Sequence, residues 1–421
     1  MEKIKDIAER QTERMSRFFK TDAAYVAKSS FWMNGNFAVS SIFGLVTSIL
    51  FANLVSKETY GTYQFILAIA STIAVFVPNN MSSAVLRAVA RGNEGDLVAA
   101  TKFQIRWGII GTIIALGTSL WYVMSNNLGL SLSLIIIAVF MPATYALNTW
   151  SAYVQGKKDY KRYFFYNTLG IVISYGGVIA MLFVKKEYLW LAGANIFFAF
   201  LANLILYFIT IKRMRPGKLT DPETIPYGTH LSIMGIPAGI TSPLDALLLF
   251  HYLGAAPLAI YSFATILPER LAGGLKFIST IIFPKFSEKN EEDVKNFFKK
   301  KIWWLLGFLS IIAGLYALLA SYVFQVFFPQ YGASIPYTRV YALHFFIIAA
   351  SVANTALLSQ KRTKDLYVSN ITTPIVKIIL LVTLMFAFGV WGVIWAQIIA
   401  IAFQIIFPLY LLHKDRSNQS Y

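Results

Sequence analysis

Twelve long apolar stretches dominate the sequence, and short polar breaks separate them. A bilayer core of roughly 30 Å is crossed by about 20 apolar residues in a helix, so each stretch is long enough to span a membrane. The sequence therefore predicts an all-α integral membrane protein with twelve transmembrane helices. These helices are expected to begin near Ser29, Tyr60, Lys102, Leu130, Tyr163, Leu189, Pro226, Pro257, Ile302, Pro336, Leu366 and Trp391.

The composition agrees with a membrane protein and excludes several other classes. Of the 421 residues, 57% are hydrophobic and only 14% are charged, which is far more apolar than the core of a soluble protein requires. There is no cysteine, and the four histidines have no ligand spacing, so neither a metal nor another cofactor is expected.

The basic residues predict the orientation. Most of the 37 Lys and Arg lie before the first span or in every second loop, whereas the loops between these contain very few basic residues. The positive-inside rule then places both termini in the cytoplasm of a multi-pass cytoplasmic-membrane protein. The net charge of +17 is mainly this topology signal, with attraction to membrane lipids as a secondary effect, and nucleic acid is not an expected partner.

The chain repeats itself weakly. When ILFANLVSKETYGTYQF (49–65) is set against LLLFHYLGAAPLAIYSF (247–263), Tyr63 meets Tyr261 and Phe65 meets Phe263 without a gap. The two segments are offset by 198 residues (261 − 63), and six spans fit in that length. Because six is an even number, both halves enter the membrane from the same side. We expect two pseudo-symmetric six-helix lobes around a central cavity. The predicted segments are 1–28, a cytoplasmic amphipathic segment that could equally be a solvated tail; 29–211, the first lobe; 212–225, a cytoplasmic linker; 226–413, the second lobe; and 414–421, a cytoplasmic tail.

The stretch SSIFGLVTSILFANLVSKETYGTYQFILAIASTIAVFV (40–77), with its Glu58-Thr59-Tyr60-Gly61-Thr62-Tyr63 turn, resembles the Wzx-type polysaccharide (O-antigen) flippases. These belong to the MOP superfamily, together with the MATE exporters and the lipid II flippase. The resemblance implies transfer of undecaprenyl-pyrophosphate-linked oligosaccharides to the outer leaflet by alternating access, through a cavity lined by helices 1, 2, 7 and 8. It also implies polysaccharide polymerase and chain-length proteins as candidate partners. The lipid II flippase has two further spans, so that narrower identity is disfavoured.

Ionisable residues within the seventh and eighth spans are the main site candidates. Gly235, Pro237, Gly239 and Pro243 are expected to break the seventh helix, with a new helix starting at Pro243 and Asp245 in its first turn. The eighth span carries Glu269 and Arg270 near its middle. Each charge would cost roughly 2.5 to 3.5 kcal/mol if it faced lipid, so the three should line a cavity or pair with one another. Asp245 could instead cap a helix, and an Arg270 salt bridge could simply join helices 7 and 8.

Other polar residues form a second group of candidates. Asn34, Asn36, Asn79 and Asn80 could bind sugar hydroxyls, since amides both donate and accept, or they could form hydrogen bonds between helices. Lys276, Arg87 and Lys285 could receive a pyrophosphate at the cytoplasmic ends of helices 8 and 2, although snorkelling flank residues would look the same. Lys377 lies inside the eleventh span, where no loop explains it.

Energetics suggest how transport is driven. Moving two negative charges out through an inside-negative potential gains roughly 4.6 kcal/mol per 100 mV. A carboxylate in a low-dielectric site can exchange protons near neutrality, so proton antiport could add to this. Arg270 is then the main anion contact, with Asp245 and Glu269 coupling it to protons. His251 is a weaker coupling candidate because it lies near the outer surface, where a structural role suits it better.

Two alternatives remain. In a MATE-like exporter of organic cations, the acidic pair would bind the substrate. Arg270, Lys276 and Lys377 outnumber Asp245 and Glu269 by one, which favours an anion. A membrane glycosyltransferase or polymerase would need a large extramembrane segment, and the predicted loops are too short to supply one. The protein is therefore expected to be a transporter and not an enzyme.

Overall fold

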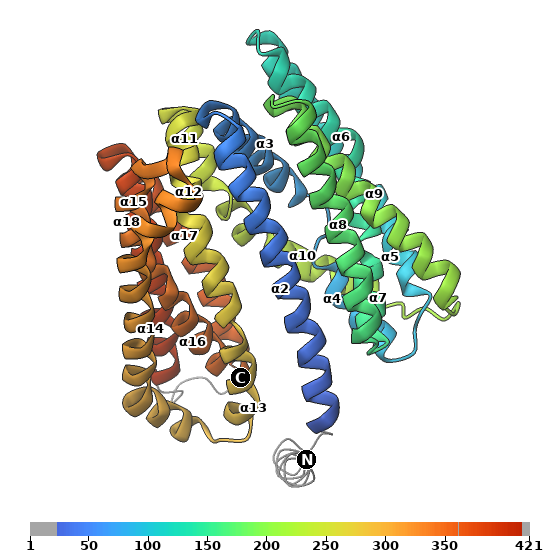
Figure 1. Ribbon diagram of the computed structural model, residues 1–421. Helices are drawn as coiled ribbons and strands as arrows, with labels where there is room; N and C mark the ends of the chain where they lie inside the picture. The colour runs from blue at the N-terminus through green and yellow to red at the C-terminus, as the bar shows by residue number, and fades with distance from the viewer. Residues whose placement is uncertain (1–22, 361, 415–421) are drawn as a thin grey trace, which may run out of the picture. The chain divides into compact units, whose positions relative to one another are not determined.

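The computed structural model describes residues 23–360 and 362–414, and within these ranges the chain is helical with no strand. Figure 1 shows the path of the helices. The first half contains α2 (Ala23–Leu54), α3 (Lys57–Ala74), α4 (Met81–Ala90), α5 (Asp96–Met124), α6 (Leu128–Leu147), α7 (Thr149–Gly156), α8 (Tyr160–Val184) and α9 (Tyr188–Met214). The second half contains α10 (Thr224–Thr241), α11 (Leu244–Leu253), α12 (Ala255–Leu275), α13 (Phe277–Ser287), α14 (Glu291–Phe327), η1 (Pro329–Ser334), α15 (Ile335–Tyr341), η2 (Ala342–Phe346), α16 (Ile347–Ser359), α17 (Thr363–Phe388) and α18 (Val390–His413). Most of the amphipathic segment predicted at the N-terminus lies outside the described residues.

Ten segments of the described chain are long and apolar enough to cross a membrane, which agrees with a multi-pass membrane protein. Two of the twelve predicted spans, those expected near Tyr60 and Pro257, are not among these ten. The first of them covers α3, which opens on the polar sequence Lys57-Glu58-Thr59, and the second covers α12, which carries Glu269 and Arg270. These two helices are thus the polar ones, and a count of twelve spans stays a prediction.

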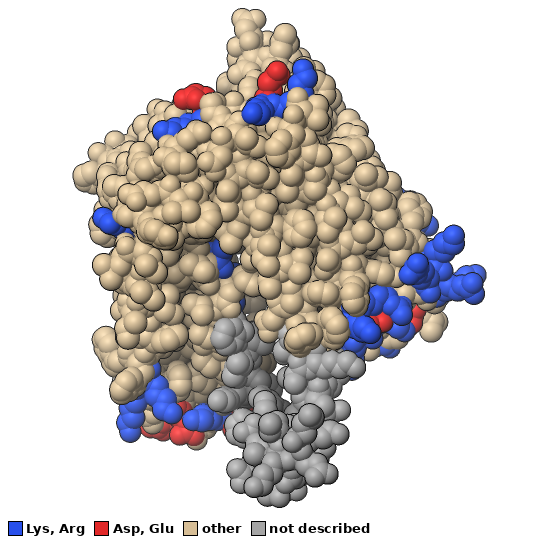
Figure 2. All heavy atoms as spheres, viewed as in Figure 1, with Lys and Arg blue, Asp and Glu red and all other residues tan. Residues whose placement is uncertain are grey.

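Large apolar side chains face outward along the spans, as expected for helices in lipid. Ile113 and Leu120 of α5 and Ile311 and Leu318 of α14 are each more than half exposed. On the face drawn in Figure 2, Lys and Arg gather mainly near helix ends, and uncharged residues cover most of the surface between. Water would disfavour so much apolar surface, whereas a bilayer core favours it.

Glycine ends two of the helices at tight turns. Gly254 (φ 91°) joins α11 to α12, and Gly389 (φ 58°) joins α17 to α18. Both residues adopt the left-handed backbone region, which costs glycine least. The next helix begins directly after each glycine, so consecutive helices turn back with almost no loop.

Two compact units divide the described residues, and most of the divisions fall within helices. The first unit comprises 23–47, 73–185 and 190–234, and the second comprises 48–72, 186–189, 235–360 and 362–414. In the first unit, Met81 and Val85 of α4, Trp150 and Tyr153 of α7 and Leu206 of α9 belong to one buried apolar cluster. The α4, α7 and α9 helices are therefore held by a common core.

A polar network fixes the loop after α9 to the first unit. The Glu94 carboxylate accepts hydrogen bonds from the Tyr153 hydroxyl (2.8 Å), Lys157 Nζ (2.6 Å) and the Gly217 N–H (3.0 Å). Asp96, which is 1% exposed, accepts from the Asp221 N–H and the Thr224 hydroxyl, each at 3.0 Å. These carboxylates hold a connecting segment that the sequence alone indicates only as a linker.

The second unit has its own core and its own buried ion network. Phe345, Ile348 and Leu412 belong to a cluster that joins α14, η2, α16 and α18. At one end of this bundle the Arg362 side chain is 2% exposed and contacts Glu291 (2.7 Å) and Asp365 (3.2 Å). It also donates to the carbonyls of Leu411 and Lys414. One guanidinium therefore ties together the start of α14, the start of α17 and the end of α18.

The two segments aligned by the internal repeat contact each other within the second unit. Tyr60 lies 4.6 Å from Phe263 between ring centroids, and Phe65 stacks on Phe250 at 3.8 Å. A Cβ on Gly61 would fall 1.9 Å from the Ala255 carbonyl oxygen, so only glycine allows α3 to approach the start of α12 this closely. The Tyr-Gly-Thr-Tyr motif thus has a packing role.

Candidate functional site

The helix break predicted within the seventh span lies between α10 and α11, at residues 242–243. Pro237 lies inside α10, and the helix stops at Thr241. Pro243 takes the position before α11 instead of its first position, as the sequence suggested, and Leu244 begins the helix. Asp245 is consequently the second residue of α11, where its Oδ1 accepts from the Ala246 N–H at 2.8 Å. The break places a carboxylate at the start of a new helix.

Uncharged donors satisfy the Asp245 carboxylate. Its Oδ2 accepts from the Tyr261 hydroxyl of α12 at 2.5 Å and from the Gln397 amide of α18 at 2.9 Å. Tyr261 and Gln397 are both buried. One carboxylate oxygen therefore joins three helices, which is more than the capping role considered from the sequence.

The neighbouring carboxylate, Glu269, is also held by a phenol. Its Oε1 accepts from the Tyr341 hydroxyl of α15 at 2.9 Å, and Tyr341 is 1% exposed. Glu269 itself is exposed although it follows the buried Pro268 within α12. Its carboxylate is thus fixed in position and still accessible.

Arg270 makes none of the ion pairs suggested by the sequence. Within the described residues no carboxylate of Asp245 or Glu269 lies within 4.0 Å of its guanidinium. Tyrosine and glutamine donors bind the two carboxylates instead. The side chain is half-buried, and its buried Nε atom has no hydrogen-bond partner. Its positive charge interacts electrostatically with the Glu269 carboxylate and with the Tyr60 hydroxyl of α3. Arg270 therefore has unused hydrogen-bonding capacity.

Two lysines add positive charge to the same region. Lys377 of α17 is half-buried, and its positive charge lies close enough to interact with both Glu269 and the half-buried His344. Lys276 follows α12, is exposed and also acts on His344. We use the name polar cluster for Asp245, Glu269, Arg270, Lys276, Lys377 and their partners Tyr261, Tyr341, His344 and Gln397. All of them belong to the second unit.

The remaining candidates lie apart from the polar cluster. Arg87 is exposed on α4 in the first unit, with its guanidinium 4.8 Å from the centre of the Tyr227 ring. His251 is exposed in the last turn of α11 and meets Tyr252 edge-on. The Lys285 side chain lies outside the described residues, although its backbone belongs to α13.

The four asparagines lie in the first unit and differ in their partners. Asn34 is exposed. Asn36 is buried, its Oδ1 accepts from Asn167 at 3.3 Å, and its Nδ2 has no partner. Asn79 and Asn80 donate to the carbonyls of Ala74 (2.9 Å) and Leu231 (3.0 Å). The last two amides serve the backbone, whereas Asn36 retains an unused donor.

Sequence reasoning missed the uncharged members of the polar cluster. It selected formal charges and so passed over Tyr261, Tyr341, His344 and Gln397. A signal existed for two of them: Tyr261 is a matched position of the repeat, and Gln397 is a polar residue in the very apolar α18. No comparable signal marks Tyr341 among 23 tyrosines.

Comparisons with known proteins agree on family and fold. Residues 26–290 match the family described as polysaccharide biosynthesis protein. Among solved structures, the lipid II flippase MurJ in an inward closed conformation gives a TM-score of 0.65 at 17% identity, with 91% of this chain and 87% of that chain covered. The MATE multidrug transporter DinF-BH gives 0.62 at 16% identity, with 93% and 95% covered. A MOP superfamily transporter from Pyrococcus furiosus gives 0.57 at 14% identity, with 93% and 96% covered. No curated protein matches.

Proposed function

We propose that this chain, which belongs to the polysaccharide biosynthesis protein family, flips a polyprenyl-pyrophosphate-linked oligosaccharide across the cytoplasmic membrane, from the inner to the outer leaflet. The family match and a fold similar to that of a lipid II flippase support this function. In the proposed architecture, twelve spans form two lobes with both termini in the cytoplasm. Polysaccharide polymerase and chain-length proteins are proposed partners.

Arg270 carries the proposal. Its guanidinium lies on a helix that also bears a carboxylate, yet it is not neutralised by an ion pair with either cluster carboxylate, and one buried N–H lacks a partner. A buried donor without an acceptor costs roughly 1 to 3 kcal/mol, so an oxyanion ligand that accepts from it is favoured. A pyrophosphate supplies such oxygens.

The charges around Arg270 support an anionic substrate. Phenol and amide donors occupy Asp245 and Glu269, whereas Arg270, Lys276 and Lys377 make no ion pair in the described part of the chain. Guanidinium and ammonium groups can therefore turn to a ligand. Asn34 and Asn36 are proposed sugar contacts, and the unpaired Nδ2 of Asn36 supports that role.

The coupling proposed here uses the membrane potential and protons. The potential favours export of a dianion by roughly 4.6 kcal/mol per 100 mV. Glu269 is exposed and can take up a proton, and Asp245 shares its carboxylate with two other helices. Asp245→Asn should abolish the response of transport to an imposed pH gradient and leave the response to an imposed potential.

A MATE-like exporter of organic cations is the competing function, because the MATE structures match nearly as well. Purified protein in liposomes with a polyprenyl-pyrophosphate glycan separates the two. Arg270→Ala should abolish glycan translocation and Arg270→Lys should keep part of it, since lysine retains the charge. Arg339→Ala is the matched control, because Arg339 is exposed and donates only to Ser321 (2.9 Å). Full translocation by Arg270→Ala, with competition by organic cations, would instead identify an exporter.

A further inference from the structure

A basic pocket lies in the first unit between the first turns of α8 and the end of α9. Its volume is about 710 Å³, and it is lined by Asp159, Lys161, Arg162, Phe165, Tyr166 and Arg213. The two helices pack antiparallel: Gly170 of α8 faces Leu206 of α9, and Gly177 faces Phe198. The start of α8 therefore meets the end of α9 at one end of the helix pair.

The pocket holds more positive than negative charge. Arg162 pairs with Asp159, with 3.2 Å between Nε and Oδ2. The Asp159 Oδ1 is occupied as well, since it caps α8 by accepting the Arg162 N–H at 3.0 Å. Lys161 and Arg213 make no ion pair in the described part of the chain. Two positive charges are thus left uncompensated.

Two other basic residues at helix ends are used differently. Lys157 is bound to Glu94, and Arg362 is buried between Glu291 and Asp365. These cations are neutralised within the protein and stabilise its loops. The lining of the pocket is different because three cations share one carboxylate.

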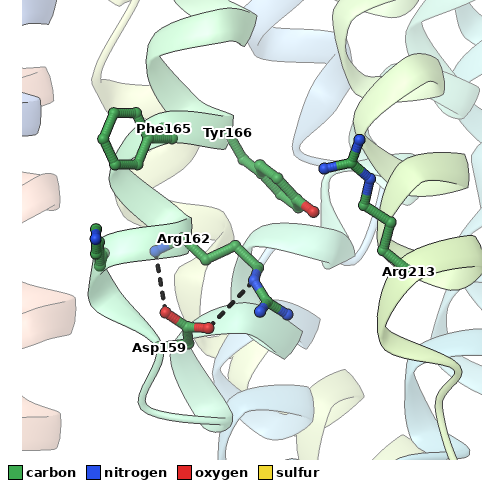
Figure 3. Close-up of a pocket in the computed structure, with 6 residues that line it drawn as sticks. Asp159, Arg162, Phe165, Tyr166 and Arg213 are labelled. Atoms are coloured by element: carbon green, nitrogen blue, oxygen red, sulfur yellow. Dashed lines mark hydrogen bonds and ion pairs between the residues drawn. The ribbon is translucent and has the colours of Figure 1, made fainter.

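The donors converge on one space. Figure 3 shows the Tyr166 hydroxyl pointing toward the Arg213 guanidinium, with the Arg162 guanidinium entering the same region from α8. Two planar guanidiniums and a phenol form a set of donors that suits a phosphate, whose oxygens accept from several N–H groups at once.

An apolar strip continues from the pocket along α8. Phe165, Leu169 and Val172 recur at helical spacing on α8 and are 53%, 42% and 44% exposed. Cations at the helix ends followed by an exposed apolar strip match the polar head and acyl chain of a lipid.

We propose that this pocket binds the phosphate of an anionic membrane phospholipid, with the acyl chain along Phe165 and Leu169. The juxtaposition of Arg162, Arg213 and Tyr166 above an apolar strip is what distinguishes the pocket from a general basic surface. The bound lipid bridges α8 and α9. The inference does not depend on what the protein transports.

Lipid binding by the full chain tests the proposal. The protein is reconstituted in phosphatidylcholine vesicles with or without phosphatidylglycerol. It is then released from the vesicles, and the lipids that stay bound to it are counted by native mass spectrometry. Arg162→Gln with Arg213→Gln should lower phosphatidylglycerol occupancy at least about tenfold, because each basic side chain near an anionic headgroup contributes substantially. Tyr166→Phe, which removes a single donor, should give a smaller loss.

The control is Lys158→Gln with Lys212→Gln, which removes two positive charges next to the pocket residues in sequence without changing its lining. Equal losses in both double variants would overturn the proposal, since they would indicate unspecific attraction to the membrane surface. Displacement of phosphatidylglycerol from the wild type by equimolar polyprenyl pyrophosphate would also overturn it, by assigning the pocket to that lipid. Melting temperatures of the two double variants check that both are folded.

Discussion

The hydroxyl of Tyr341 donates a hydrogen bond to Oε1 of Glu269 over 2.9 Å, and Tyr341 is almost fully buried whereas Glu269 is exposed. A buried phenol therefore fixes an accessible carboxylate without neutralising it. The position of the Glu269 carboxylate depends on Tyr341, whereas its charge does not. The position and the charge can therefore be tested by substitutions at different residues.

Tyr341→Phe removes the donor and keeps the ring. We expect the protein to lose about 1 kcal/mol of stability, the typical net contribution of one hydrogen bond, and glycan translocation to fall. Tyr316→Phe is the matched control because the Tyr316 hydroxyl bonds to the Thr338 hydroxyl (2.6 Å) and contacts no carboxylate there. Melting temperature and translocation are measured for both. Equal translocation by the two variants would contradict a role for Glu269 in transport.

Glu94 makes stability depend on pH. Hydrogen bonds from Lys157 and from the Gly217 N–H lower the pKa of this carboxyl from its ordinary value of 4.5 to about 2. Because the folded-state pKa is lowered, the ionised group stabilises the fold fully above about 4.5, and this stabilisation disappears as the pH falls toward 2. At neutral pH the wild type should have a higher melting temperature than Glu94→Gln. This difference in melting temperature should shrink as the pH is lowered. A difference that stays constant over this range would contradict the assignment.

Arg362→Leu should destabilise the second unit strongly. The substitution leaves two backbone carbonyls without their donor and reduces the partners of Glu291 to Lys295. Breaking a buried ion pair costs roughly 3 to 5 kcal/mol. Thermal unfolding in detergent measures the loss. Arg339→Ala, at an exposed site, should change stability by less than about 0.5 kcal/mol. Similar melting temperatures for the two variants would show that the Arg362 network adds little.

Gly61→Ala should prevent correct folding or lower its yield sharply. The added Cβ would meet the Ala255 carbonyl oxygen at 1.9 Å, and backbone at both sites must move to relieve the clash. Gly117→Ala is the control, since nothing lies within 4 Å of a Cβ at that position in α5, and alanine there should stabilise the helix slightly. Monodisperse protein recovered after purification is the measure. Normal recovery of Gly61→Ala would mean that α3 and α12 pack less closely.

The fold class was largely predictable from the sequence, because span length and polarity follow from the thickness of the bilayer. The resemblance of residues 40–77 to polysaccharide flippases is confirmed by the family match over residues 26–290. The α3 and α12 helices were harder to predict as spans, since their polar residues lower the hydropathy by which a span is identified. Segment boundaries and orientation stay predictions.

The site was only partly predictable. Arg270, Glu269 and Asp245 stand out because charges are rare in apolar helices. Their partners depend on contacts between α12 and residues far along the chain, at Tyr341 and Gln397, and no local pattern specifies such contacts. A salt bridge with Arg270 was the simpler expectation, whereas the structure has tyrosine donors at both carboxylates. The roles of these residues in transport stay predictions.

The shared oxygen of Asp245 has a mechanical consequence. As an anion it accepts from Tyr261 and Gln397 together, so α11, α12 and α18 are latched by one atom. Removal of that oxygen would leave both donors without their acceptor at once. A change at a single side chain would thereby release α11 from the other two helices.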